Sequence, residues 1–197
     1  MNAAHSDTIV LASGSSIRRR LLEAARIPFE VDPADIDEEA LVEADPVRRA
    51  AALARAKAAV VSARRPGRFV LGADQVFALE GRLFPKPESK DAARKMLMLM
   101  AGKTHRFACG FCLMRDGRVL EEGVDQAAVT FWRFPETVAA WYAETGEGLG
   151  CAGAYRLEEG GIRLIEKIEG DHFTILGLPM VPFVAAWRRH VAGSAAN

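Results

Sequence analysis

The start of the chain combines small hydroxyl residues with arginines in an order suited to holding an anion. A short apolar run is followed by Ser13, a glycine and Ser15, and then by three arginines, Arg18 to Arg20, which open a predicted helix. Backbone N–H groups at a helix N-terminus favour a phosphate, and arginine adds fixed charge. The alternative is a solvated basic helix face that follows an edge strand.

Two further polar residues stand out by their neighbours. Asp74 follows the apolar run Phe69–Ala73, and carboxylates are rarely buried unpaired. Because the carboxyl ends of strands line the crevice of open α/β sheets, Asp74 could activate water or hold a metal; the alternative is a turn cap. Lys86 lies between Pro85 and Pro87, whose fixed φ angles restrict the backbone on both sides of the lysine. Such rigid placement suits a cation that binds a phosphate, and the alternative is a simple exposed loop.

Two other charged positions are candidates for the same chemistry. Glu38 belongs to the acidic stretch 37–39, which could supply oxygens to a metal, although acidic loops are usually only solvated. Lys57 lies near the apolar stripe of a predicted helix, where it could reach a cleft or extend its ammonium to solvent.

The three cysteines are Cys109, Cys112 and Cys151. The first two have the C-x-x-C spacing but fall within a predicted strand, where positions three apart point to opposite faces. Redox pairs usually sit at a helix N-terminus, and no second pair or matched histidines indicates zinc. The sequence therefore predicts buried thiols.

Composition indicates one globular unit, and we expect a single domain over residues 1–197. Lys plus Arg equals Asp plus Glu at 26 each, so no global field favours nucleic acid or a membrane surface. No apolar run approaches the about 20 residues of a membrane span. The start MNAAHSD lacks the pattern of a secretion signal, so the expected location is the cytoplasm.

These candidates must be positioned by alternating strands and helices, which predict an α/β fold. Expected strands cover 8–12, 27–31, 68–73, 106–115 and 118–131, and a hairpin covers 77–84. Expected helices cover 16–25, 46–63 with Asp45 as N-cap, 90–100 with Ser89 as N-cap, 135–145, and the segment after Pro179. The glycine-rich stretch 146–161 is expected to hold turns and short strands.

A series of short motifs runs along the chain in a fixed order. They are LASGSSIRRRLL (11–22), Asp37-Glu38, Lys57-Ala58, ADQV (73–76), PKP (85–87), Ala92 through Met96-Leu97 to Gly102 and His105, AGAY (152–155), IEG (168–170) and LGLP (176–179). The series resembles the Maf family of nucleoside triphosphate pyrophosphatases over nearly the whole chain.

The resemblance implies a mixed twisted sheet flanked by helices, with two lobes around a cleft, as in the inosine triphosphatase (Ham1) architecture. It implies hydrolysis of a nucleoside triphosphate between the α- and β-phosphates, which releases a monophosphate and pyrophosphate, with Mg²⁺ or Mn²⁺ as divalent metal. The nucleotide is the expected partner, a homodimer is common in the family, and no nucleic acid or membrane is expected.

Family roles carry over to matching positions of this chain. The catalytic positions are Asp74, as the proton acceptor, Lys86 and Arg18. The substrate-binding positions are Ser13, Ser15, Lys57 and Glu158, and the metal positions are Glu38 and Asp74. Pro85 replaces the usual glycine before Lys86, which leaves the geometry of that lysine to be tested.

Three positions predict which base is read. The resemblance implies arginine, threonine and glutamine at the positions of Ile17, Gln75 and Glu158 in the branch that hydrolyses dTTP and UTP. In the 7-methyl-GTP branch it implies an apolar residue, glutamine and glutamate, and this chain is similar to that branch. Methylated guanine is positively charged, and Glu158 can also accept hydrogen bonds from guanine N1–H and N2–H₂. The sequence predicts a preference for 7-methyl-GTP, with dTTP/UTP hydrolysis as the alternative.

The same residues are compatible with two other function classes. A non-catalytic nucleotide-binding regulator of cell division would explain the loss of an arginine at Ile17, but the presence of Asp74 and Lys86 favours an enzyme. An RNA-binding module built on Arg18–Arg20 fits poorly, because the net charge is zero and no aromatic platform accompanies the arginines.

Overall fold

Seven strands form one mixed sheet in the computed structural model, which describes residues 8–192. Their order is β2-β1-β3-β5-β6-β7, with β4 paired to the end of β3. β1 is parallel to both neighbours, and the remaining pairs are antiparallel. The strands are β1 Ile9–Leu11, β2 Phe29–Val31, β3 Phe69–Leu79, β4 Arg82–Leu83, β5 Thr104–Arg115, β6 Arg118–Phe131 and β7 Ile165–Gly170.

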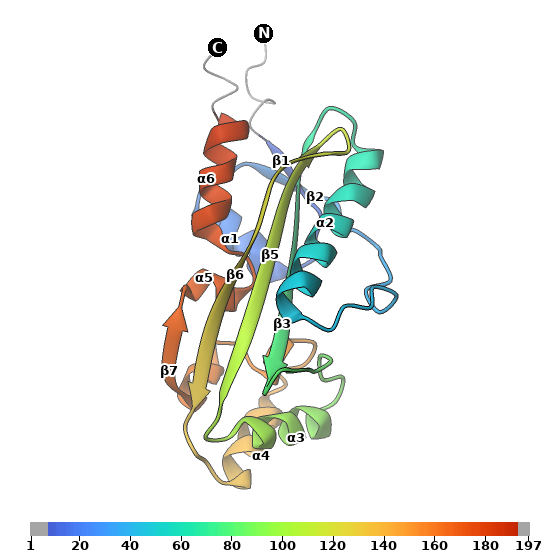
Figure 1. Cartoon of the computed structure of the whole chain (residues 1–197). Coiled ribbons are helices and arrows are strands. Elements are labelled where there is room, and N and C mark those ends of the chain that lie inside the picture. Colours follow the sequence, from blue (N-terminus) through green and yellow to red (C-terminus); the bar gives the residue numbers. More distant parts are fainter. Residues whose placement is uncertain (1–7, 193–197) are drawn as a thin grey trace.

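Helices flank this sheet on both faces and at one end (Figure 1). They are α1 Ser16–Ala24, α2 Pro46–Arg64, α3 Lys90–Met100, α4 Glu136–Thr145, α5 His172–Leu176 and α6 Met180–His190, with 3₁₀ turns at Ala152–Ala154 and Gly160–Leu164. α3 and α4 lie at the far end of the long strands from β1, β2 and α6 (Figure 1).

The helix α2 lies unusually close to β3 and β5 because glycines face it. A Cβ atom at Gly72 would lie 2.1 Å from the carbonyl oxygen of Ala54, and one at Gly110 would lie 2.4 Å from that of Ala50. Side chains alternate along a strand, so Asp74 faces the same helix as Gly72. The glycines therefore bring α2 within reach of Asp74.

We expect Gly72→Ala to lower the free energy of unfolding by about 1–3 kcal/mol, because the added methyl would overlap the α2 backbone. Urea denaturation at constant pH measures this change. Gly14→Ala is the matched control, since its Cβ would meet only Pro33 at an ordinary 3.9 Å. Equal stability of the two variants would contradict the close packing of α2.

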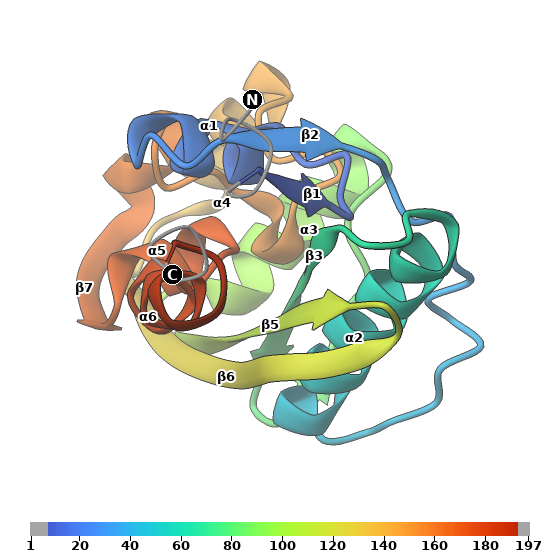
Figure 2. The ribbon, with the colours of Figure 1, turned by 90° about the horizontal axis from the view of Figure 1, so that it is seen from above.

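The opposite face of the sheet is covered by α1, α5 and α6, which Figure 2 shows across the strands from α2. Leu22 of α1 and Phe183 of α6 share one buried cluster with Leu71 of β3 and Leu113 of β5. A second cluster joins α3 and α4 to the far halves of β3, β5 and β6. The two clusters give the structure the two lobes that the sequence predicts.

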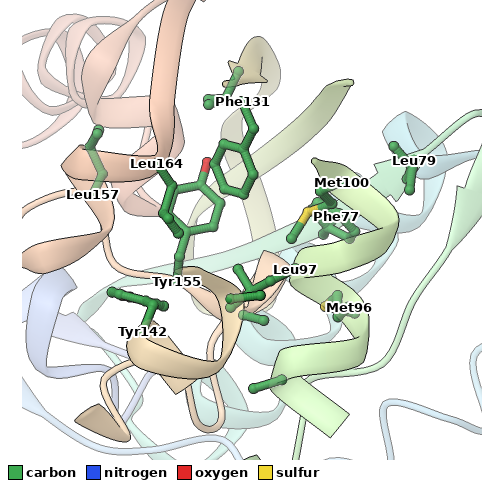
Figure 3. Packing of buried hydrophobic residues seen from close by; sticks show 14 of the residues in the cluster. Phe77, Leu79, Met96, Leu97, Met100, Phe131, Tyr142, Tyr155, Leu157 and Leu164 are labelled. Carbon is green, nitrogen blue, oxygen red and sulfur yellow. The ribbon is translucent and has the colours of Figure 1, made fainter. Parts of the chain in front are cut away.

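The second cluster surrounds a buried histidine. His105 is 1% exposed, and its ring lies 4.7 Å from that of Phe131 and 5.4 Å from that of Phe77, measured between centroids. Its Nε2 atom lies 3.0 Å from the hydroxyl of Tyr155, which packs beside Phe131 in Figure 3. Burial lowers the pKa of His105 to about 3, so the ring is neutral at physiological pH.

This histidine predicts a loss of stability in acid. The unfolded chain takes up a proton at His105 below about pH 6.5, whereas the folded protein does so only near pH 3. Between these two pH values, each unit of acidification should lower the contribution of His105 to the free energy of unfolding by about 1.4 kcal/mol. We expect the stability difference between wild type and His105→Phe to change accordingly in urea denaturation at pH 7 and pH 4.5. A pH-independent difference would contradict the assignment.

Most predicted elements are confirmed. Asp45 caps α2 through a hydrogen bond from the backbone N–H of Arg48, and Ser89 caps α3 through one from Ala92. β6 has the predicted bounds, and the turn at Asp116-Gly117 has the positive φ angles that this sequence favours.

Two expectations about elements are wrong, and one helix was missed. β3 does not end at Ala73 but runs on to Leu79, because β5 pairs with it over its whole length. The stretch 146–161 contains turns and 3₁₀ segments but no strand within the described residues, and the strand β7 follows it. The short helix α5 was not expected.

Two cysteines are buried as predicted, and the third is not. Cys109 and Cys112 are fully buried, and burial raises the pKa of each thiol to about 12. Cys151 is only half-buried, since it lies in the loop after α4. No helix among residues 8–192 is long and apolar enough to cross a membrane. The expectation about a secretion signal falls on residues 1–7, which lie outside the described part of the chain.

Candidate functional site

A cavity of about 510 Å³ opens beyond the end of β1, beside the part of β3 that extends past its pairing with β1. β1 pairs with β3 only up to Leu71, and Asp74 and Gln75, which follow on β3, line the cavity. The β1–α1 loop, the loop after β2, the segment 149–158 and the end of α5 complete the wall. The cavity thus lies between the two lobes.

All ten residues proposed from the sequence line this one cavity. They are Ser13, Ser15, Ile17, Arg18, Glu38, Lys57, Asp74, Gln75, Lys86 and Glu158. The neighbouring arginines Arg19 and Arg20 are exposed and do not line it, as expected for solvated helix residues.

Arg18 is held rigidly at the first turn of α1. Its Nε donates to the carbonyl oxygen of Gly177 at 2.7 Å, and its NH1 donates to Ser13 Oγ at 2.8 Å. Ser15 caps the helix by accepting from the backbone N–H of Arg18 at 3.5 Å. Although Arg18 is only 8% exposed, no carboxylate within residues 8–192 forms an ion pair with it. A buried, unpaired guanidinium at a helix N-terminus suits an incoming anion.

Gln75 is fixed by the short helix α5. Its Nε2 donates to the carbonyl oxygens of Thr174 and Ile175, at 2.9 and 2.7 Å. The hydroxyl of Thr174 in turn donates to Asp125 Oδ2 on β6 at 3.0 Å. The amide nitrogen of Gln75 is therefore committed to the backbone of α5.

Asp74 and Glu38 share one cation. Lys57 Nζ lies 2.5 Å from Asp74 Oδ1 and 2.6 Å from Glu38 Oε1. Asp74 and Lys57 are 5% and 7% exposed, whereas Glu38 lies in a more open loop. Burial raises the pKa of Glu38, but the hydrogen bond and charge of Lys57, with weaker effects of Lys86 and Arg18, lower it overall. Glu38 is therefore a carboxylate near neutral pH.

Two charged residues at the cavity remain exposed. Lys86 and Glu158 form no hydrogen bond or ion pair with any other described residue. Both are thus available to a ligand. Lys86 lines the cavity although Pro85 replaces the glycine that the resemblance implies before it.

The donor set fits a divalent metal that is shared with a phosphate. Asp74 and Glu38 converge on the same cation, and Mg²⁺ typically takes one or two carboxylates together with substrate oxygens. Within the described residues, however, no group of three or more Asp, Glu, His or Cys side chains could hold a metal. These two carboxylates could therefore provide only part of a metal's coordination shell.

The cavity also contains a residue that sequence reasoning missed. Arg156 donates to Glu159 Oε1 at 3.1 Å and to Cys151 Sγ at 3.4 Å. Its backbone N–H donates to the hydroxyl of Tyr142 at 3.0 Å. The sequence signal that could have identified Arg156 is its position directly after the AGAY motif. An arginine next to a cavity-lining tyrosine can also reach a molecule bound in the cavity.

Comparison with known proteins places this cavity in a family. The family model described as Maf-like protein matches residues 8–190. A nucleoside triphosphate pyrophosphatase of Nitrobacter winogradskyi is 42% identical over 93% of this chain and 94% of that protein. A 7-methyl-GTP pyrophosphatase of Rhizobium etli is 44% identical over 91% of this chain and 94% of that protein.

A solved structure of a HAM1 protein from Coxiella burnetii superposes with a TM-score of 0.45 at 19% identity, over 65% of this chain and 74% of that one. The family model covers the sheet, both lobes and every residue of the cavity. The chain therefore belongs to the Maf family.

Proposed function

We propose that this protein hydrolyses nucleoside triphosphates between the α- and β-phosphates and releases a monophosphate and pyrophosphate. The observation that carries the proposal is the cavity wall, where one buried carboxylate, Asp74, stands among three cations, Arg18, Lys57 and Lys86. A triphosphate carries about four negative charges, which these three cations can offset together with a divalent metal. The names of relatives more than 40% identical support the same activity.

Asp74 is the proposed general base. Its Oδ1 is held by Lys57, and its second oxygen accepts no hydrogen bond from the described residues. This oxygen can orient a water molecule and take its proton as the water adds to phosphorus. The anhydride bond then breaks, and pyrophosphate departs with the bridging oxygen.

The cations act on the departing charge. Arg18 presents a fixed fork of N–H groups, and Lys86 adds an exposed ammonium that lines the same cavity. Glu38 and Asp74 would hold the divalent metal, which when bound offsets charge on the phosphate oxygens. Ser13 and Ser15 would contact the phosphates from the β1–α1 loop, where Ser13 already orients Arg18.

We propose 7-methyl-GTP as the preferred substrate. Ile17 removes the positive charge that an arginine would bring to the cavity, and Glu158 supplies an unpaired carboxylate at the same cavity. A positively charged base gains from both changes. Glu158 can further accept hydrogen bonds from the guanine N1–H and N2–H₂ groups.

A nucleotide panel tests the activity and the preference together. Wild type with Mg²⁺ or Mn²⁺ should release pyrophosphate, not phosphate, and should turn over 7-methyl-GTP faster than dTTP, UTP or GTP. Glu158→Gln should reduce kcat/KM for 7-methyl-GTP relative to dTTP by about 10- to 200-fold. Glu159→Gln, which changes a neighbouring carboxylate paired with Arg156, is the control. Faster turnover of dTTP by wild type would overturn the preference, and phosphate release would overturn the activity.

A further inference from the structure

Lys57 occupies the point at which the two proposed metal ligands converge. Its Nζ is within 2.6 Å of one oxygen of Asp74 and one of Glu38, and its side chain is 8% exposed. The helix α2 projects this lysine from the layer packed on β3, because Gly72 and Gly110 let the helix approach closely. The ammonium therefore stands where a cation is needed in the nucleotide-free protein.

A divalent ion and this ammonium compete for the same two carboxylates. Both are cations, and no third acidic, histidine or cysteine side chain of the described residues enlarges the site. Mg²⁺ and Mn²⁺ prefer about six oxygen ligands, of which these carboxylates provide a minority. In the absence of phosphate, the metal would have to displace a buried ion pair and then complete its shell with water alone.

We propose that Lys57 is a placeholder for the divalent metal, which binds tightly only together with nucleotide. The phosphates attract the ammonium of Lys57 away from Asp74 and Glu38, and they supply the missing oxygen ligands to the metal. Lysine suits this exchange because its ammonium sits on a flexible stem and Lys57 also lines the cavity. The inference rests on the proposed function for the identity of the ligand.

The exchange makes metal and nucleotide binding mutually dependent. A coupling between two ligands is reciprocal and typically changes affinity by about 5- to 150-fold. The lysine also keeps Asp74 and Glu38 paired while the cavity is empty, since the buried carboxylate of Asp74 beside a second carboxylate is costly without a cation. Removal of the lysine should free the carboxylates for the metal and weaken the coupling.

The test measures Mn²⁺ affinity by electron paramagnetic resonance, with and without a non-hydrolysable α,β-methylene triphosphate. Wild type should bind Mn²⁺ at least about tenfold more tightly with the analogue. Lys57→Met should bind Mn²⁺ alone about tenfold more tightly than wild type and respond less to the analogue. Lys86→Met is the matched control, because it removes the same charge from the same cavity without touching a described carboxylate.

Three results would overturn the proposal. They are wild-type Mn²⁺ affinity that does not depend on the analogue, no Mn²⁺ binding in either state, and equal effects of Lys57→Met and Lys86→Met. The first two need no variant, so a Lys57→Met protein that fails to fold leaves the proposal testable. Pyrophosphate release is assayed separately. An active enzyme with uncoupled metal binding therefore refutes the placeholder alone, and an inactive protein refutes the proposed function.

Discussion

Asp74→Asn is expected to lower kcat for pyrophosphate release by about 10²- to 10⁴-fold, the range that a positioned general base contributes. The amide keeps the size of the side chain and can still accept a hydrogen bond from Lys57, so the fold and the cavity should persist. It cannot take a proton from water. Steady-state turnover of 7-methyl-GTP with pyrophosphate detection gives the value.

The control for Asp74→Asn is a second carboxylate, Asp125, which ends the hydrogen-bond chain that runs from Gln75 through Thr174. Asp125→Asn changes a carboxylate that accepts from Thr174 and does not line the cavity. Its effect on kcat should be much smaller. Nucleotide binding to Asp74→Asn, measured by calorimetry with the non-hydrolysable analogue, should persist. Activity of Asp74→Asn close to that of wild type would remove Asp74 from the mechanism.

The local features of the fold could be predicted from the sequence. Caps such as Asp45 and Ser89 act on helix N–H groups three residues away, so nearby residues suffice to predict them. The length of β3 could not be read in this way, because Asp74 and Gln75 look like the end of a strand. They stay in the strand because Gly110 and Cys109 of β5 pair with them, and that pairing is set by distant residues.

The same distinction separates the predicted and the missed parts of the site. Residue types and motif order predicted which side chains line the cavity, and the structure brings all ten together. Their contacts are long-range: Gln75 bonds to carbonyl oxygens of α5 about 100 residues away, and Arg18 bonds to Gly177. Backbone carbonyls carry no residue-type signal, so the fixed orientation of Gln75 and Arg18 could only come from the structure.

Arg18→Gln is expected to lower kcat/KM by about 10²- to 10³-fold, the range measured when one donor to a developing negative charge is removed. The variant loses the positive charge but can still hydrogen-bond to its neighbours. Arg19→Gln is the matched control, since Arg19 occupies the next position of α1 and is exposed. Its activity should stay within about twofold of wild type, as for a surface substitution.

Arg18→Lys separates charge from geometry. Lysine keeps the charge but cannot reproduce the paired contacts of Arg18 with Gly177 and Ser13, which fix the guanidinium in the cavity. If orientation matters, Arg18→Lys should recover only part of the activity lost in Arg18→Gln. Full recovery would mean that charge alone is used. Equal activity of Arg18→Gln and Arg19→Gln would contradict a phosphate contact, because the buried and the exposed arginine would then be equivalent.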